Sequence, residues 1–124
     1  MFANERDNKN YDIFVGGWFS DYNDPLDFLN VMKTGVYDSY GLYSNSEYDS
    51  LIDSLTGEND NAKRLEIYQK LEDLLVAQDC GVTPLYYSDK HYYYQNWVKD
   101  FYTSSFGASQ ELYRATVELS LIHI

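Results

Sequence analysis

The residues best placed to do chemistry lie in one short segment, 16–25, which reads Gly-Gly-Trp-Phe-Ser-Asp-Tyr-Asn-Asp-Pro. Glycines at the end of a strand let a second extended backbone approach and hydrogen-bond to it, as happens when a peptide adds to a sheet edge. Trp18 supplies an aromatic wall, and Asp21 could bind a cationic amino group. Asp21 could also be a capping or turn aspartate. The segment therefore favours a binding site for a peptide-like ligand.

Asp21 and Asp24 also allow a different chemistry. Two carboxylates can perform acid/base catalysis on a glycosidic bond, so a secreted glycosidase or other hydrolase is the alternative from another class. A calcium loop of the EF-hand type is excluded, because that pattern needs a glycine at its sixth position and a glutamate at its twelfth. Leu26 and Met32 occupy those positions.

The sequence lacks the residue pattern that nucleophilic catalysis needs. A serine or cysteine nucleophile needs a positioned base, but His91 is the one histidine before the last six residues, and no nucleophile-elbow sequence is present. His91 is expected to be a strand residue. Cys80 lacks the Cys/His spacing of a zinc site and is expected to be a packed thiol. We therefore expect no catalytic residue, no metal, no cofactor and no enzymatic activity.

The composition excludes several classes of partner. Twenty acidic residues against nine basic ones give a net charge of −11, and no Lys/Arg cluster could neutralise a run of phosphates. Nucleic acid is therefore not expected as a partner. No stretch approaches the roughly 20 apolar residues that span a bilayer, so this segment is not expected to insert directly into a membrane. Because the first ten residues are polar, an export signal is expected to lie outside this sequence.

The strands that must position segment 16–25 follow from apolar runs. Residues 11–18 predict a buried strand, because Ile13, Phe14 and Val15 are continuous rather than alternating. Further strands are expected at 82–87, 91–95 and 112–117. The tyrosines at 86–87 and 92–94 put phenol rings on both faces of adjacent strands. Half of them are expected in the core and the rest in an adaptable pocket, where Tyr87 is assigned to the ligand.

Three helices are expected between these strands. Asp24 followed by Pro25 predicts a helix start, because the carboxylate can cap free N–H groups and proline costs no hydrogen bond at the first helical position. A second helix is expected from Asn45 to Gly57, and the longest over 61–79. The expected apolar faces are Leu26, Phe28, Leu29 and Met32; Tyr48, Leu51, Ile52 and Leu55; and Ile67, Tyr68, Leu71, Leu74 and Leu75.

Three stretches taken in order resemble a known family. They are 17–25, the helix start Asn-Ser-Glu-Tyr-Asp-Ser-Leu-Ile at 45–52, and Arg-Leu-Glu-Ile-Tyr at 64–68 leading to Val-Thr-Pro-Leu-Tyr-Tyr at 82–87. Over residues 11–118 the chain resembles the bacterial extracellular solute-binding proteins of family 5, which serve peptide and nickel ABC importers.

The resemblance implies an α/β fold: a fragment of a bilobal periplasmic-binding-protein type II architecture, with a mixed sheet and flanking helices. Family members are several times longer, and these stretches fall in their last quarter. Residues 1–88 would then be part of the C-terminal ligand-binding lobe, and 89–118 a return segment to the N-terminal lobe. Residues 119–124 match the translation of a sequencing-library adapter and are expected to be a non-native tail.

The resemblance also implies a function. It is non-catalytic capture of oligopeptides outside the cytoplasm, in the periplasm or on a cell-surface lipoprotein, with delivery to the membrane permease subunits of an ABC importer. Asp21 would receive the α-amino group of the peptide, backbone around Gly17 and Phe19 would pair with it, and Trp18 would wall the first side-chain pocket. A nickel chelate or another solute on the same scaffold is the alternative ligand.

Overall fold

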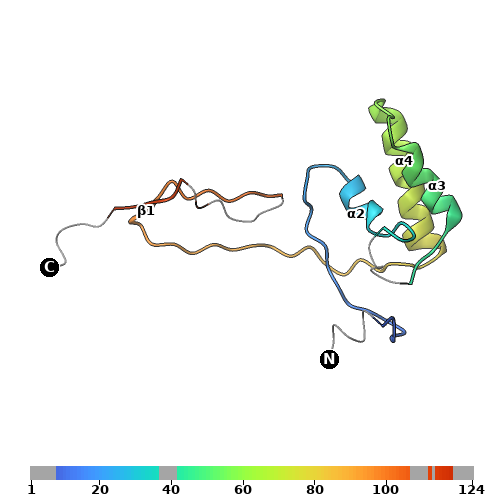
Figure 1. Cartoon of the computed structure of the whole chain (residues 1–124), viewed down its shortest axis with the longest axis horizontal. Helices are drawn as coiled ribbons and strands as arrows, with labels where there is room; N and C mark the ends of the chain where they lie inside the picture. The colour runs from blue at the N-terminus through green and yellow to red at the C-terminus, as the bar shows by residue number, and fades with distance from the viewer. Residues whose placement is uncertain (1–7, 37–41, 107–111, 113, 119–124) are drawn as a thin grey trace. The chain divides into compact units, whose positions relative to one another are not determined.

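The computed structural model describes residues 8–36, 42–106, 112 and 114–118 (Figure 1). The chain divides into two units, Met1–Pro84 and Leu85–Ile124. We call them the N-terminal unit and the C-terminal unit and describe each by itself.

The N-terminal unit contains the helices. They are α2 (Leu26–Asn30), α3 (Ser46–Ser54) and α4 (Asn61–Glu72), and α4 continues as the π-helix η1 (Asp73–Gln78) (Figure 1). The Asn45 side chain caps α3 by accepting hydrogen bonds from the backbone N–H groups of Glu47 and Tyr48. Asp60 caps α4 by accepting from the Ala62 N–H at 2.9 Å. The predicted helices are thus confirmed, although α3 ends before Gly57 and the end of the longest helix is π-helical.

One hydrophobic core joins these helices. Its buried members are Leu29, Val31, Met32, Tyr48, Ile52, Leu55, Leu71, Leu74 and Leu75. Tyr48 and Leu71 are fully buried, and the Tyr48 hydroxyl donates a hydrogen bond to the Leu29 carbonyl at 2.8 Å. The apolar faces predicted for α3 and α4 are largely those that pack. In the face predicted for α2, Leu29 and Met32 are buried, but Phe28 is 48% exposed.

The strands predicted at 11–18, 82–87 and 91–95 are wrong for this chain, since the described residues there form no ladder. Ile13 is 85% exposed and Leu85 70% exposed. A strand needs a neighbouring backbone to satisfy its N–H and C=O groups. In the described part of the chain none of these three segments has a strand partner, so they stay outside any sheet.

The C-terminal unit contains a small antiparallel ladder. Strand β1 (Val98–Lys99) pairs with β2 (Thr116–Val117), with Val98 opposite Val117. The Glu118 N–H extends the ladder by donating to the Trp97 carbonyl at 2.8 Å. Strand β2 covers the end of the strand predicted at 112–117. The described residues thus form helices and one two-stranded sheet instead of the predicted mixed sheet.

Several side chains of the two units differ from their predicted environments. Tyr86, Tyr87, Tyr93 and Tyr94 are exposed, because the strands that would have placed half of the tyrosine rings in a core do not form. His91 is likewise exposed and outside any strand. Cys80 is exposed rather than packed; it lies just after η1, in a left-handed backbone conformation with a φ of 52°.

The division at Pro84 does not test the assignment of residues 1–88 and 89–118 to two lobes, which stays a prediction. The tail predicted at 119–124 lies outside the described residues. None of the described helices has the length and apolar character needed to cross a membrane.

Candidate functional site

Residues 18–24 connect the extended segment before them to helix α2, and we call them the 18–24 loop. Backbone and side-chain bonds within the loop define its turn. The Asp24 N–H donates to the Tyr22 carbonyl at 3.0 Å, and the Ser20 hydroxyl donates to the same carbonyl. Two carboxylates, Asp27 and Asp24, attach the loop to the helical core.

Asp27 holds the first half of the loop. Its Oδ2 accepts a hydrogen bond from the Trp18 indole Nε1–H at 3.0 Å and another from the Asp21 backbone N–H at 2.9 Å. Asp27 is 7% exposed and lies in the first turn of α2, where the free N–H groups of the helix favour a negative charge. These two hydrogen bonds therefore link the Trp18 ring and the Asp21 backbone through one oxygen of a buried carboxylate.

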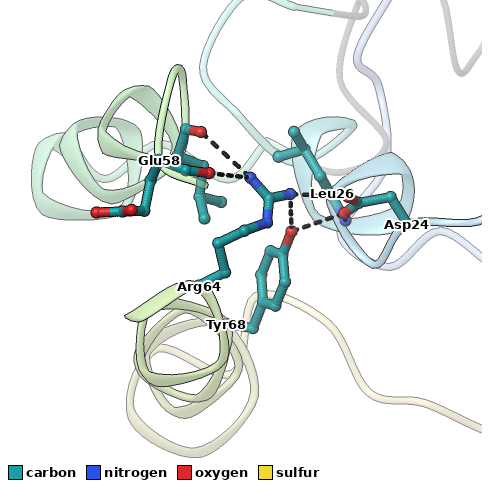
Figure 2. Close-up of polar contacts among 6 residues, drawn as sticks. Asp24, Leu26, Glu58, Arg64 and Tyr68 are labelled. Atoms are coloured by element: carbon teal, nitrogen blue, oxygen red, sulfur yellow. Dashed lines mark hydrogen bonds and ion pairs between the residues drawn. The ribbon is translucent and has the colours of Figure 1, made fainter. Parts of the chain in front are cut away.

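Asp24 holds the second half of the loop (Figure 2). Its Oδ1 accepts hydrogen bonds from the Leu26 N–H at 2.8 Å and from the Tyr68 hydroxyl at 2.6 Å. Its Oδ2 forms an ion pair with Arg64 Nη2 at 2.7 Å. Asp24 thus caps α2, as predicted, and also ties the start of α2 to α4.

Arg64 is the centre of this second attachment. Its Nη1 donates to the carbonyls of Leu55 and Glu58 at 3.3 and 3.2 Å, and its Nη2 also donates to the Tyr68 hydroxyl. Figure 2 shows the guanidinium between the residues after α3 and the Asp24 carboxylate. Since each contact is a charged hydrogen bond in a partly buried position, the end of the loop is firmly fixed.

The electrostatics of this cluster keep Asp24 ionised. Burial would raise the pKa of Asp24, but the hydrogen bonds from Tyr68 and the Leu26 N–H, with the Arg64 charge, lower the pKa below its ordinary value of 3.8. Burial and the Asp24 carboxylate raise the pKa of Tyr68 to about 12. Tyr68 is therefore a neutral donor and Asp24 a charged acceptor over the whole physiological range.

Asp21 differs from these two carboxylates. Its side chain is exposed and accepts no hydrogen bond from any residue in the described ranges. Its backbone is held by Asp27, so the carboxylate projects from a fixed position. It can accept charged hydrogen bonds from a cationic ligand without breaking an existing bond.

The other predicted site residues lie in or directly before the 18–24 loop, or in the other unit. A methyl group built at Gly17 would meet nothing within 4 Å, so the space beside this backbone is open. Phe19 is exposed. Tyr87 belongs to the C-terminal unit and is fully exposed, and its assignment to the ligand stays a prediction. Within the described residues, no group of three His, Cys, Asp or Glu side chains could hold a metal ion.

Sequence reasoning missed three residues that build the site. Arg64 and Tyr68 are four positions apart, which places them on one face of α4, and this spacing was a usable signal. Asp27 is an acidic residue between Leu26 and Phe28 in an apolar stretch, and the sequence does not show what it would contact.

The chain is similar to several curated binding proteins. It is 31% identical over 97 residues to a periplasmic oligopeptide-binding protein of Salmonella typhimurium, covering 78% of this chain and 18% of the relative. It is 29% identical over 102 residues to an oligopeptide-binding protein of Bacillus subtilis, covering 81% and 17%. It is also 34% identical over 70 residues to a probable deoxycholate-binding periplasmic protein of Escherichia coli, covering 56% and 13%. The chain spans less than a fifth of the length of these relatives. No family model and no solved structure matches it.

Proposed function

Because this chain belongs to the extracellular solute-binding proteins of family 5, we propose that it forms part of a receptor that captures oligopeptides outside the cytoplasm and delivers them to an ABC importer. The relatives carry names of binding proteins rather than enzymes. On this proposal the permease subunits of the importer are the protein partners, and the compartment is the periplasm or the cell surface.

The observation that carries the proposal is the state of Asp21. It is an exposed carboxylate on a backbone fixed by Asp27, beside the Trp18 ring that the same oxygen holds. When a peptide is enclosed, its ammonium group loses water and needs a charged partner. Asp21 supplies that partner, and Trp18 supplies an apolar surface for the first side chain.

Gly17, Phe19 and Tyr87 complete the proposed set of ligand contacts. The open space beside Gly17 supports close approach of a second backbone, which is the recognition that a peptide of any sequence can use. Phe19 and Tyr87 are exposed aromatic residues that can cover apolar side chains of the ligand.

The state of Asp24 argues against the hydrolase alternative. A general acid in a glycosidase must carry a proton, and its pKa is raised for that purpose. The pKa of Asp24 is lowered, and its two oxygens are occupied by Leu26, Tyr68 and Arg64. Asp24 therefore serves the structure of the loop and is not available as the second carboxylate that this chemistry would need beside Asp21.

The proposal includes an architecture. In the complete protein, residues 1–88 belong to the C-terminal lobe of a bilobal α/β fold, and 89–118 return to the other lobe. The ligand lies between the lobes, and the upstream part of the protein supplies the residues that hold the peptide's carboxyl end.

Calorimetry with the complete protein tests the role of Asp21. The probes are tri-alanine with a free amino group and its N-acetylated twin, after unfolding and refolding to remove bound ligand. We expect a strong preference for the free amine. Asp21→Ala should lose about 2 to 5 kcal/mol of binding free energy, or roughly 30-fold to several thousand-fold in affinity, and most of that preference.

Asp73→Ala is the matched control, because Asp73 is an exposed carboxylate on η1 with no bond to the 18–24 loop. It should bind both peptides as the wild type does. Equal binding of the two peptides by the wild type would contradict the proposed function.

A further inference from the structure

Asp27 is the one charged residue buried in the described part of the chain. Its two bonds lead to Trp18 and Asp21, the two residues that the proposed function places against the amino-terminal residue of the ligand. Asp27 itself is too enclosed to contact that ligand. Its effect on binding must therefore be exerted through the residues that it holds.

A buried carboxylate at this position needs a physical reason. Removing a charge from water is costly, and an apolar side chain of the same size often stabilises a core better. Val31, one helical turn after Asp27, belongs to the hydrophobic core, so an apolar residue would also suit this face of α2. What the carboxylate adds is a single oxygen that two donors, three residues apart, both reach.

We propose that Asp27 is a positioning residue that preorganises the ligand site by fixing the Trp18 ring and the Asp21 backbone in one arrangement. The inference rests on the proposed role of Asp21 as the amine anchor. Because both donors meet at Oδ2, the wall and the anchor cannot move independently. The ordering of the loop is then complete before the ligand arrives, and binding does not have to supply it.

The experiment uses the complete protein with three Asp27 variants and the same two tri-alanine peptides. Asp27→Ala removes the carboxylate that accepts both hydrogen bonds. Asp27→Leu keeps the shape of the side chain without an acceptor and covers the case in which the alanine variant does not fold. Asp27→Asn keeps the shape and one acceptor oxygen. Asp49→Ala is the matched control, because Asp49 accepts a backbone hydrogen bond from Thr34 at 3.0 Å and does not bond to the 18–24 loop.

Two readouts separate positioning from a merely structural role. The first is the preference for the free amine over the acetylated peptide. It should fall roughly ten-fold or more in the alanine and leucine variants, stay within about three-fold of wild type in the asparagine variant, and stay unchanged in Asp49→Ala. The second is the Trp18 indole N–H in the ligand-free protein: when the Asp27 carboxylate is lost, its resonance should move upfield and its proton should exchange faster with solvent.

The outcomes distinguish this inference from the proposed function. If wild type prefers the free amine and Asp21→Ala abolishes that preference, but folded Asp27→Leu retains it, the positioning role is wrong and the proposed function stands. An unchanged Trp18 indole resonance in Asp27→Leu also overturns the positioning role. If wild type does not distinguish the two peptides, the proposed function fails and this inference fails with it.

Discussion

The helices of the N-terminal unit and the extended segments on either side of them all contain apolar residues, but these residues lie in opposite environments. Leu71 on α4 is fully buried, whereas Ile13 before α2 and Leu85 after η1 are largely exposed. A helix satisfies its backbone within itself and needs partners for one face alone. A strand needs a second backbone before its side chains can be buried. The helices therefore bury their apolar faces against one another in this chain, and we propose that the extended segments need further strands before theirs are buried.

The largest expected effect concerns the core. Leu71→Ala should lower the free energy of unfolding by about 2 to 5 kcal/mol, because it removes a fully buried side chain and leaves a cavity. Urea unfolding followed by far-ultraviolet circular dichroism measures this. Leu65→Ala is the matched control, since Leu65 lies exposed on the same helix, and it should change the value by less than about 0.5 kcal/mol. Equal effects of the two variants would mean that α4 has no buried face.

The next effect concerns the attachment between α2 and α4. Asp24→Asn keeps the side chain's shape but loses the charge opposite Arg64, which should cost about 1 to 3 kcal/mol at pH 7. The sign of the pH dependence follows from the lowered pKa of Asp24. Its contribution is present above the ordinary pKa of 3.8 and is lost as the pH falls below that value through the folded pKa.

Unfolding curves from pH 7 down to pH 2 test this dependence. Wild type and Asp24→Asn should converge in stability at the acid end. A constant difference across the whole range would show that the ionisation of Asp24 does not contribute. Asp53→Asn is the control, because its pair with Lys33 is exposed and should add little at any pH.

Local signals made much of the helical part predictable. The Asp24-Pro25 start, the Asn45 cap and the apolar spacing along 61–79 act within a few residues, and the structure contains the corresponding helices. The strands were predicted from apolar runs alone, and those runs do not specify a partner. In the candidate site, Asp21 and Trp18 were predicted from their residue types, and their contact with a ligand stays a prediction. Their attachment to Asp27 depends on how the loop folds back onto α2, and no spacing rule encodes that contact.

A smaller effect concerns the capping of α3. The Asn45 side chain accepts two backbone hydrogen bonds at the helix start, and Asn45→Ala should cost about 1 kcal/mol of unfolding free energy. Asn59 offers a matched control, because its side chain donates one exposed hydrogen bond to the Gly57 carbonyl and caps no helix. Asn59→Ala should change stability by less than about 0.5 kcal/mol. The same urea titration measures both, and a larger effect at Asn59 would contradict the assignment of the cap.

The smallest expected effect concerns the extended segments. It tests whether their apolar side chains are exposed because the segments lack neighbouring strands. Ile13→Ser in this chain should change the free energy of unfolding by less than about 0.5 kcal/mol, since the side chain is exposed. In the complete protein, where we propose that upstream segments supply the missing backbone partners, the same change should cost about 2 to 5 kcal/mol, because a buried apolar side chain would be lost and a hydroxyl introduced. Measuring the variant in both proteins therefore isolates the contribution of the partner strands.

Two outcomes would contradict this comparison. A small effect in both proteins would mean that residues 11–18 form no buried strand in either. A large effect in the present 124-residue chain would mean that the segment packs without partner strands.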